Sequence, residues 1–361
     1  MTGGQDTPLA ASFRRLIQRH GPMPVARYMG ESNARYYTTR DPLGAAGDFT
    51  TAPEISQMFG EMVGLWLADI WVRAGRPPDA IYVELGPGRG TLARDALRAM
   101  ASQGLRPDVH LVEGSQALRE VQAGVLGAAQ FHDGIDTLPD DRPILLAANE
   151  FLDALPIRQL VLTEKGWRER MVALGEDERF LFAAGPSPMD DAVPDRPRAT
   201  DIGTVLETCP AAAAMIEALS NRLDVQGGAA LFIDYGHLAP RTGSTLQAVR
   251  AHAKVGIFDA PGEMDLTAHV DFPTLSEIAA RSGLATATTT QGAWLTAMGV
   301  VLRAQALSAR SPERAQDIAA AHDRLVGDDA MGDLFKCMAL TPRDWPRGAG
   351  FPEGPRRKET A

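Results

Sequence analysis

The chain has 361 residues, of which 45% are hydrophobic and 23% charged, an ordinary globular composition with room for two domains. Its formal net charge of -10 and pI near 5.3 argue against a nucleic-acid partner, because phosphate backbones require a concentrated basic surface. No apolar run reaches the roughly 18 residues that cross a bilayer, so membrane insertion is not expected. Cys209 and Cys337 lie far apart, which indicates neither a disulfide framework nor a zinc site and favours a reducing, bacterial cytoplasm.

The first 78 residues predict a helical cap. Leu9, Phe13 and Ile17 recur at helical spacing near its start, and a second, more apolar helix is expected over residues 58–74.

From residue 80 onward, short apolar runs alternate with helical patterns. These runs are AIYVELG, VHLVEG, AQFHDG, PILLAANE and AALFIDYG. They are apolar on both faces, which is typical of buried parallel strands in an α/β sheet. We therefore expect an α/β core over residues 79–156 and 227–345.

The interval of about 70 residues between the fourth and fifth runs is too long for one crossover helix. It predicts a β-hairpin over residues 158–174, a loop over 185–203 and a helix over 211–223. We expect an inserted lobe over 157–226, following the carboxyl end of the fourth strand, where open α/β sheets bind ligands. Residues 346–361 are rich in Pro, Gly and charge and predict a disordered tail.

The segment IYVELGPGRGTLARDALRAM joins an apolar run to a helix through three glycines. Gly86, Gly88 and Gly90 let the backbone approach a ligand closely, and the helix start offers unpaired N–H groups. No Gly-Lys-Ser/Thr follows, and the spacing is not G-x-G-x-x-G, so a P-loop and a dinucleotide site are both disfavoured. S-adenosylmethionine fits better, because Glu84 can face its cationic methionine end and Glu113 can bond both ribose hydroxyls. The alternative is two strands that end in glutamate without function.

Six motifs in order give a specific resemblance. ELGPGRGTL, GDFTTAPEISQMFGE, ANEFLDALPIRQ, FIDYGH, DLTAHVDF and TQGAWLTAMG together resemble the MidA / NDUFAF7 family of class I S-adenosylmethionine-dependent methyltransferases. The resemblance extends over residues 9–340. It implies a Rossmann-like core and, from the mitochondrial members, symmetric dimethylation of an arginine in the quinone-proximal core subunit of respiratory complex I.

Asn149, Glu150 and Asp153 follow the fourth strand, at the edge where methyl donor and acceptor meet in this fold class. The two carboxylates can hold a guanidinium and take the proton lost on methylation, with Asn149 beside the cofactor. The alternative is a helix start capped by Asn149, with the acids in its first turn.

Further polar residues follow other strands. Asp234 and His237 in FIDYGH are expected to accept a proton or orient the substrate, the alternative being structural hydrogen bonds at strand ends. A metal site that combines them with DLTAHVDF is disfavoured, because no HxH or HxxxH pair is present and methyl transfer needs no metal. His132 and Asp133 are expected at the adenine edge, with a plain turn as the alternative.

The loop GDFTTAPE precedes the second helix. We expect it to fold over the methionine end of the cofactor through Gly47, Asp48, Thr50, Thr51 and Glu54, with the threonines as donors. A simple helix start at Pro-Glu is the alternative, but it leaves the glycine, the aspartate and the threonine pair unexplained.

The glycine turn and its acids predict an S-adenosylmethionine-dependent methyltransferase, with S-adenosylhomocysteine as product, and the resemblance implies a protein arginine as acceptor and a complex I core subunit as partner. One alternative is a methyltransferase for a small molecule or another protein side chain. A second is an assembly factor that binds the cofactor without turnover. The sequence does not indicate the oligomeric state.

Overall fold

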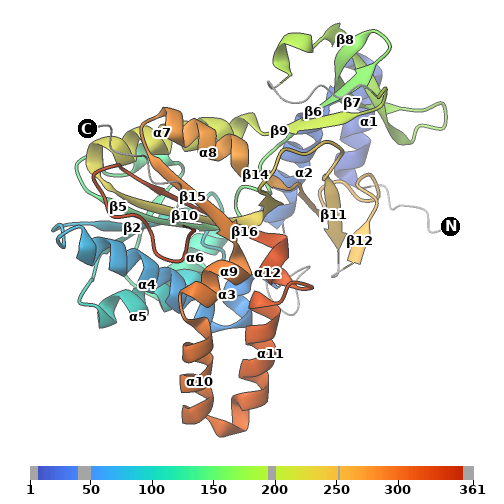
Figure 1. Cartoon of the computed structure of the whole chain (residues 1–361). Coiled ribbons are helices and arrows are strands. Elements are labelled where there is room, and N and C mark those ends of the chain that lie inside the picture. The colour runs from blue at the N-terminus through green and yellow to red at the C-terminus, as the bar shows by residue number, and fades with distance from the viewer. Residues whose placement is uncertain (1–6, 40–49, 194–200, 251–252, 353–361) are drawn as a thin grey trace. The chain divides into compact units, whose positions relative to one another are not determined.

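The computed structural model describes residues 7–39, 50–193, 201–250 and 253–352. Two compact units are present (Figure 1): unit 1 consists of Met1–Thr50, Leu152–Ala214 and Ala239–Asp271, and unit 2 of Thr51–Phe151, Met215–Leu238 and Phe272–Ala361. Residues 51–78, expected in the cap, thus belong with the core, and residues 239–271, expected in the core, belong with the inserted segment. No helix within the described ranges is long and apolar enough to cross a membrane.

Unit 2 is built on a sheet whose strands run in the order β15-β16-β10-β5-β2-β3-β4. They are β2 (Ile81–Leu85), β3 (Asp108–Val112), β4 (Gln130–His132), β5 (Ile144–Asn149), β10 (Gly228–His237), β15 (Ala285–Thr290) and β16 (Phe335–Thr341). The strands from β10 to β4 are parallel, whereas β16 is antiparallel to both of its neighbours. The five predicted strands are confirmed. The winding reverses between β2 and β5, so a ligand-binding switch point lies at their carboxyl ends.

Helices cover both faces of this sheet. Figure 1 shows α7 and α8 on one face and α4 and α5 on the other. The helices are α3 (Ala52–Ile55), α4 (Gln57–Arg73), α5 (Thr91–Ser102), α6 (Gln116–Leu126), most of α7 (Pro210–Gln226), α8 (Phe272–Arg281), α9 (Gln291–Ala297), α10 (Val300–Arg310), α11 (Ala315–Val326) and α12 (Met331–Leu334), with the 3-10 turns η1 (Ile135–Thr137) and η3 (Pro312–Arg314).

Helix α4 is the predicted second helix, and it packs tightly on α5. Phe59, Val63 and Trp66 are buried, as the apolar pattern predicts. A Cβ atom at Gly64 would collide with the backbone of Ala96, so glycine is needed for this close approach. The contact fixes α5, the helix that begins at the glycine turn.

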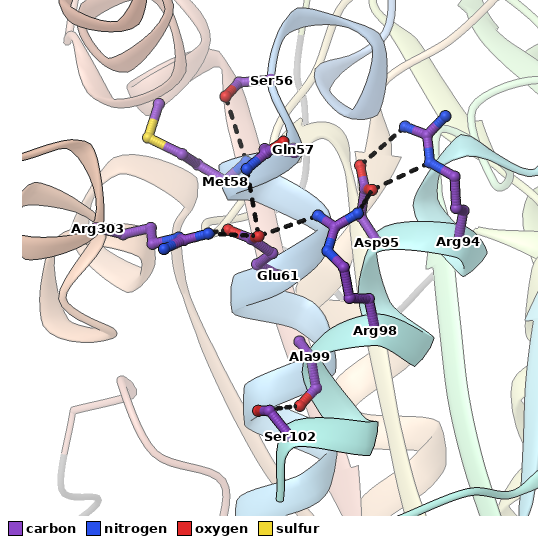
Figure 2. A network of polar contacts seen from close by, with 10 residues as sticks. All are labelled: Ser56, Gln57, Met58, Glu61, Arg94, Asp95, Arg98, Ala99, Ser102 and Arg303. Carbon is purple, nitrogen blue, oxygen red and sulfur yellow. Dashed lines mark hydrogen bonds and ion pairs between the residues drawn. The ribbon is translucent and has the colours of Figure 1, made fainter. Parts of the chain in front are cut away.

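A buried ion-pair network joins α4, α5 and α10 (Figure 2). Glu61 is 5% exposed and is contacted by Arg303 at 2.6 Å and by Arg98 at 3.0 Å. Arg98 also lies 2.8 Å from Asp95, which Arg94 contacts as well. Burial tends to raise the pKa of Glu61, but the two arginines lower it below its ordinary value. The network therefore anchors the helical pair α10 and α11 to the core of unit 2.

Unit 1 has a hydrophobic core of its own, with Phe13, Tyr28 and Val172 among its members. Its elements are α1 (Pro8–His20), β1 (Met23–Pro24), α2 (Val25–Thr39), β6 (Arg158–Thr163), β7 (Gly166–Leu174), β8 (Phe180–Pro188), η2 (Asp190–Ala192), β9 (Val205–Thr208), β11 (Gln247–Arg250), β12 (Ala253–Val255), β13 (Asp265–Thr267) and β14 (Val270–Asp271). Strands β6 and β7 form the predicted hairpin. The prediction of a loop from residue 185 is wrong at its start, because β8 pairs with β7 alone and an edge strand tolerates proline.

Part of the predicted tail is ordered against the core of unit 2. The Trp66 indole Nε1 donates to the Ala349 carbonyl at 3.0 Å, and the Phe351 ring meets Trp66 edge-on with centroids 6.3 Å apart. An aromatic contact and a partly buried hydrogen bond thus hold a segment whose composition predicts disorder. Residues 353–361 lie outside the described residues.

Candidate functional site

The glycine turn between β2 and α5 requires glycine at three positions. Gly86, Gly88 and Gly90 have φ angles of 61°, 54° and 78°, in the left-handed region that other residues occupy at a cost. At Gly86 a Cβ atom would also lie 2.7 Å from Cδ2 of Phe151, in the turn that follows β5. The turn therefore brings bare backbone to the switch point, as predicted.

Glu84 lies inside β2, 2% exposed, and its Oε2 accepts a hydrogen bond of 2.5 Å from the Tyr82 hydroxyl. Burial raises the pKa of Glu84 to about 8, and the tyrosine bond lowers it only in part. The carboxyl group is therefore mostly protonated at neutral pH, and a nearby cation would favour its ionisation. Its predicted place beside the methionine ammonium stays a prediction.

Glu113 follows β3, and its carboxylate is held from two sides. Oε1 accepts the Ser115 N–H at 2.8 Å, and Oε2 accepts the Gln122 amide at 3.2 Å. The same amide nitrogen donates to the Gly88 carbonyl at 2.7 Å. Gln122 thus links the glycine turn to Glu113, the residue that is predicted to bind the ribose hydroxyls. Sequence reasoning missed it, because a glutamine within a helix gives no signal of its own.

His132 has partners for both ring nitrogens. Nε2 lies 2.9 Å from Nδ1 of His110, and Nδ1 lies 2.9 Å from the Thr137 hydroxyl. Burial lowers the pKa of both histidines, that of His110 to about 4, so the pair is neutral at pH 7. Asp133 pairs with Arg119 at 2.5 Å and is largely exposed. The predicted contact of His132 and Asp133 with adenine stays a prediction.

The turn after β5 carries the most unusual backbone of the site. Glu150 has a φ of 51°, although it is not glycine. Its N–H donates to the Ile233 carbonyl at 2.9 Å. Its Oε1 accepts Asn149 Nδ2 at 2.9 Å and the Ala52 N–H, the first of α3, at 3.3 Å. Residues held in such conformations gather at functional sites, where the surrounding structure compensates for the strain.

The alternative of a helix that starts at Asn149 is wrong. Residues 150–156 form turns, and the buried carboxylate of Asp234 accepts the Phe151 N–H at 3.1 Å and the Tyr235 N–H at 2.9 Å. Asp234 thus fixes the Glu150 turn from the neighbouring strand, which is one of the two roles predicted for it.

The other predicted site residues lie in several places. Asp153 is buried in unit 1, where its carbonyl accepts the Ala268 N–H at 3.0 Å. His237 is half-buried at the end of β10 in unit 2. Thr50 is the last residue of the first segment of unit 1. Gly47 and Asp48 lie outside the described residues.

Thr51 and Glu54 belong to α3 and its start. Thr51 occupies the N-cap position without a side-chain capping bond, which leaves its hydroxyl for other use. Glu54 is in the first turn of α3 and lines a cavity of about 400 Å³. Thr91 and Arg94 at the start of α5 line the same cavity, so it adjoins the helix that follows the glycine turn.

Comparisons with known proteins indicate the family of enzymes to which this chain is related. Residues 62–290 match the family described as "Putative S-adenosyl-L-methionine-dependent methyltransferase". The chain belongs to this family. It is 34% identical to the mitochondrial protein arginine methyltransferase NDUFAF7 of Mus musculus, over 94% of this chain and 85% of that protein. The human protein of the same name is 33% identical, over 98% and 88%.

A solved structure also resembles this methyltransferase. It is a "likely methyl transferase" from Burkholderia thailandensis bound to S-adenosyl-homocysteine, 28% identical with a TM-score of 0.82, covering 96% of this chain and 95% of that one. The predicted Rossmann-like methyltransferase fold and the cofactor are thereby confirmed.

The residues at the switch point fit S-adenosylmethionine. Three glycines in the left-handed region form a tight turn at the carboxyl end of β2, and the carboxylate of Glu113 after β3 is already fixed by hydrogen bonds. When bound, the cofactor supplies a methyl group on a sulfonium, which is itself a good leaving group. The chain needs no nucleophile of its own, and its residues have to bind, align and exclude water.

Proposed function

We propose that this methyltransferase acts on an arginine of a protein, through the carboxylate of Glu150. The observation that carries the proposal is the strained turn at Glu150, an acid that directly follows β5, one of the two strands beside the switch point. A guanidinium is planar and pairs with a carboxylate through two parallel hydrogen bonds. Glu150 would orient the attacking nitrogen and take its proton, and His237, in the same unit, would contribute a further polar contact.

Two relatives named protein arginine methyltransferase, each more than 30% identical over most of this chain, support the choice of acceptor. As the family resemblance implies, the proposed acceptor is an arginine in the quinone-proximal core subunit of respiratory complex I, dimethylated symmetrically. The cytoplasm of a bacterium is the proposed compartment.

The test incubates the purified protein with isotope-labelled S-adenosylmethionine and the purified complex I subunit, and separates the methylated arginines after hydrolysis. We expect label in symmetric dimethylarginine. Glu150→Gln should bind S-adenosylhomocysteine normally and lower turnover by roughly 10²- to 10⁴-fold, the usual contribution of a general base. Glu120→Gln, an exposed acid on α6, is the matched control.

Three results would refute the proposal. Label in a small molecule, when cell extract replaces the purified subunit, would indicate another acceptor. Cofactor binding without any transfer would indicate an assembly factor. Normal turnover in Glu150→Gln would remove Glu150 from the chemistry.

A further inference from the structure

Helix α6 buries one polar residue and leaves two of its valines exposed. Gln122 is its only buried residue, with no exposed surface, whereas Val121 and Val125 are 43% and 42% exposed. A surface helix ordinarily turns its apolar residues inward. A buried polar side chain in this setting is the informative exception, because it has to be held there by specific partners.

The partners of Gln122 belong to two different parts of the cofactor site. Its Nε2 contacts the carbonyl of Gly88 and Oε2 of Glu113, and two acceptors fix which end of the amide is the nitrogen. Its Oε1 finds no hydrogen-bond partner among the described residues. A buried acceptor without a partner costs stability, so folding alone gives little reason for a glutamine here.

We propose that Gln122 is a positioning residue, which holds the Glu113 carboxylate against the glycine turn in the orientation that receives both ribose hydroxyls of the cofactor. Without the amide, Glu113 would keep only the Ser115 N–H and could rotate away from the turn. The inference rests on the proposed contact of Glu113 with ribose. Gln122 itself acts through Glu113 and Gly88.

Calorimetric titration of four proteins with two ligands tests this role. The ligands are S-adenosylhomocysteine and its 2′,3′-dideoxy analogue, which lacks the hydroxyls that Glu113 would bind. Gln122→Met removes the amide at similar volume and should weaken S-adenosylhomocysteine binding about 10- to 100-fold. The loss for the analogue should be at least about fivefold smaller. Gln116→Met, at the exposed start of the same helix, should change neither affinity.

Equal losses for both ligands in Gln122→Met would show a purely structural role and overturn the proposal, as would no loss at all. Glu113→Gln tests the ribose contact of Glu113 separately from the positioning role of Gln122. If this variant loses equal affinity for both ligands, the ribose contact itself is wrong. If only Gln122→Met fails to discriminate, the positioning role alone is wrong.

Gln122→Glu provides a second test with nearly the same shape. It places two carboxyl groups side by side, so S-adenosylhomocysteine binding relative to wild type should recover as the pH falls from 8 to 5.5 and a proton again bridges them. A pH-independent loss would contradict the proposal, and this variant also decides the matter if Gln122→Met does not fold.

Discussion

Glu84→Gln is expected to stabilise the protein at neutral and alkaline pH. Glu84 lies in the central strand β2, 2% exposed, and its partner is the hydroxyl of Tyr82 rather than a positive charge. Burial raises its pKa from 4.5 to about 8. A glutamine keeps an acceptor for the tyrosine but never ionises, so it avoids the desolvation of a charge.

The sign and size of this gain in stability follow from the difference in proton binding between the folded and unfolded states. Between pH 4.5 and 8 the folded protein binds more protons at Glu84 than the unfolded chain does, so the free energy of unfolding falls as the pH rises through this window. The displacement of the pKa corresponds to about 5 kcal/mol, because each tenfold change in an ionisation constant is about 1.4 kcal/mol. We expect Glu84→Gln to gain less than about 1 kcal/mol at pH 5 and about 3 to 5 kcal/mol at pH 9.

Urea unfolding of both proteins at several pH values gives the difference directly, and other titrating groups cancel in the subtraction. A difference that does not change with pH would refute the reasoning. Since the predicted partner of Glu84 is the ammonium of the cofactor, the same substitution should weaken S-adenosylhomocysteine binding. A gain in stability with a loss of affinity is typical of a residue kept for function.

Three further substitutions follow from the geometry of the site and its support. Gly86→Ala should lower the free energy of unfolding by about 2 to 3 kcal/mol and remove most of the affinity for S-adenosylhomocysteine in calorimetry, because a Cβ there meets a neighbouring ring. Gly104→Ala, at a φ of 81° in open space, should lower the free energy of unfolding by only about 1 kcal/mol and leave the affinity unchanged. Glu61→Gln should lower the free energy of unfolding, measured in urea, by about 2 kcal/mol. A double-mutant cycle with Arg303→Gln should give a coupling energy of only about 1 kcal/mol, because the arginine is partly exposed to solvent. Glu150→Gly should be about 1 kcal/mol more stable than Glu150→Ala, because both variants lose the hydrogen bonds of the carboxylate and only glycine relieves the left-handed backbone; turnover should fall in both.

Each of these has an outcome that would contradict it. Equal effects at Gly86 and Gly104 would mean that the neighbouring ring is not a constraint. Additive losses at Glu61 and Arg303 would mean that the ion pair does not couple α4 to α10. Equal stability of Glu150→Gly and Glu150→Ala would mean that the turn is not strained.

The sequence predicts the core of this protein well because its signals there are local. Five short apolar runs indicate strands, and their separation by helices indicates parallel pairing, although the edge strand β4 is partly exposed. Three glycines between a strand and a helix indicate backbone that other residues would strain, and all three have positive φ angles. The order of the motifs is sufficient for the family.

The turn after β5 shows where local reasoning fails. Asn149 and two acids read as a helix start, because such residues commonly cap helices. The conformation is decided instead by Asp234, which is 83 positions further on and accepts the Phe151 N–H. The unit boundaries and the ordered segment around Ala349 are likewise set by contacts between residues far apart in the chain.

The sequence by itself determined the fold class, the cofactor turn and the acids at the sheet edge, because periodicity, glycine spacing and strand ends are properties of short segments. Only the tertiary structure decided which of these acids are fixed and by what. The amide of Gln122 meets Glu113 and Gly88, and Glu61 receives two arginines. Hydrogen bonds between side chains of different elements depend on packing in three dimensions, which no single segment encodes.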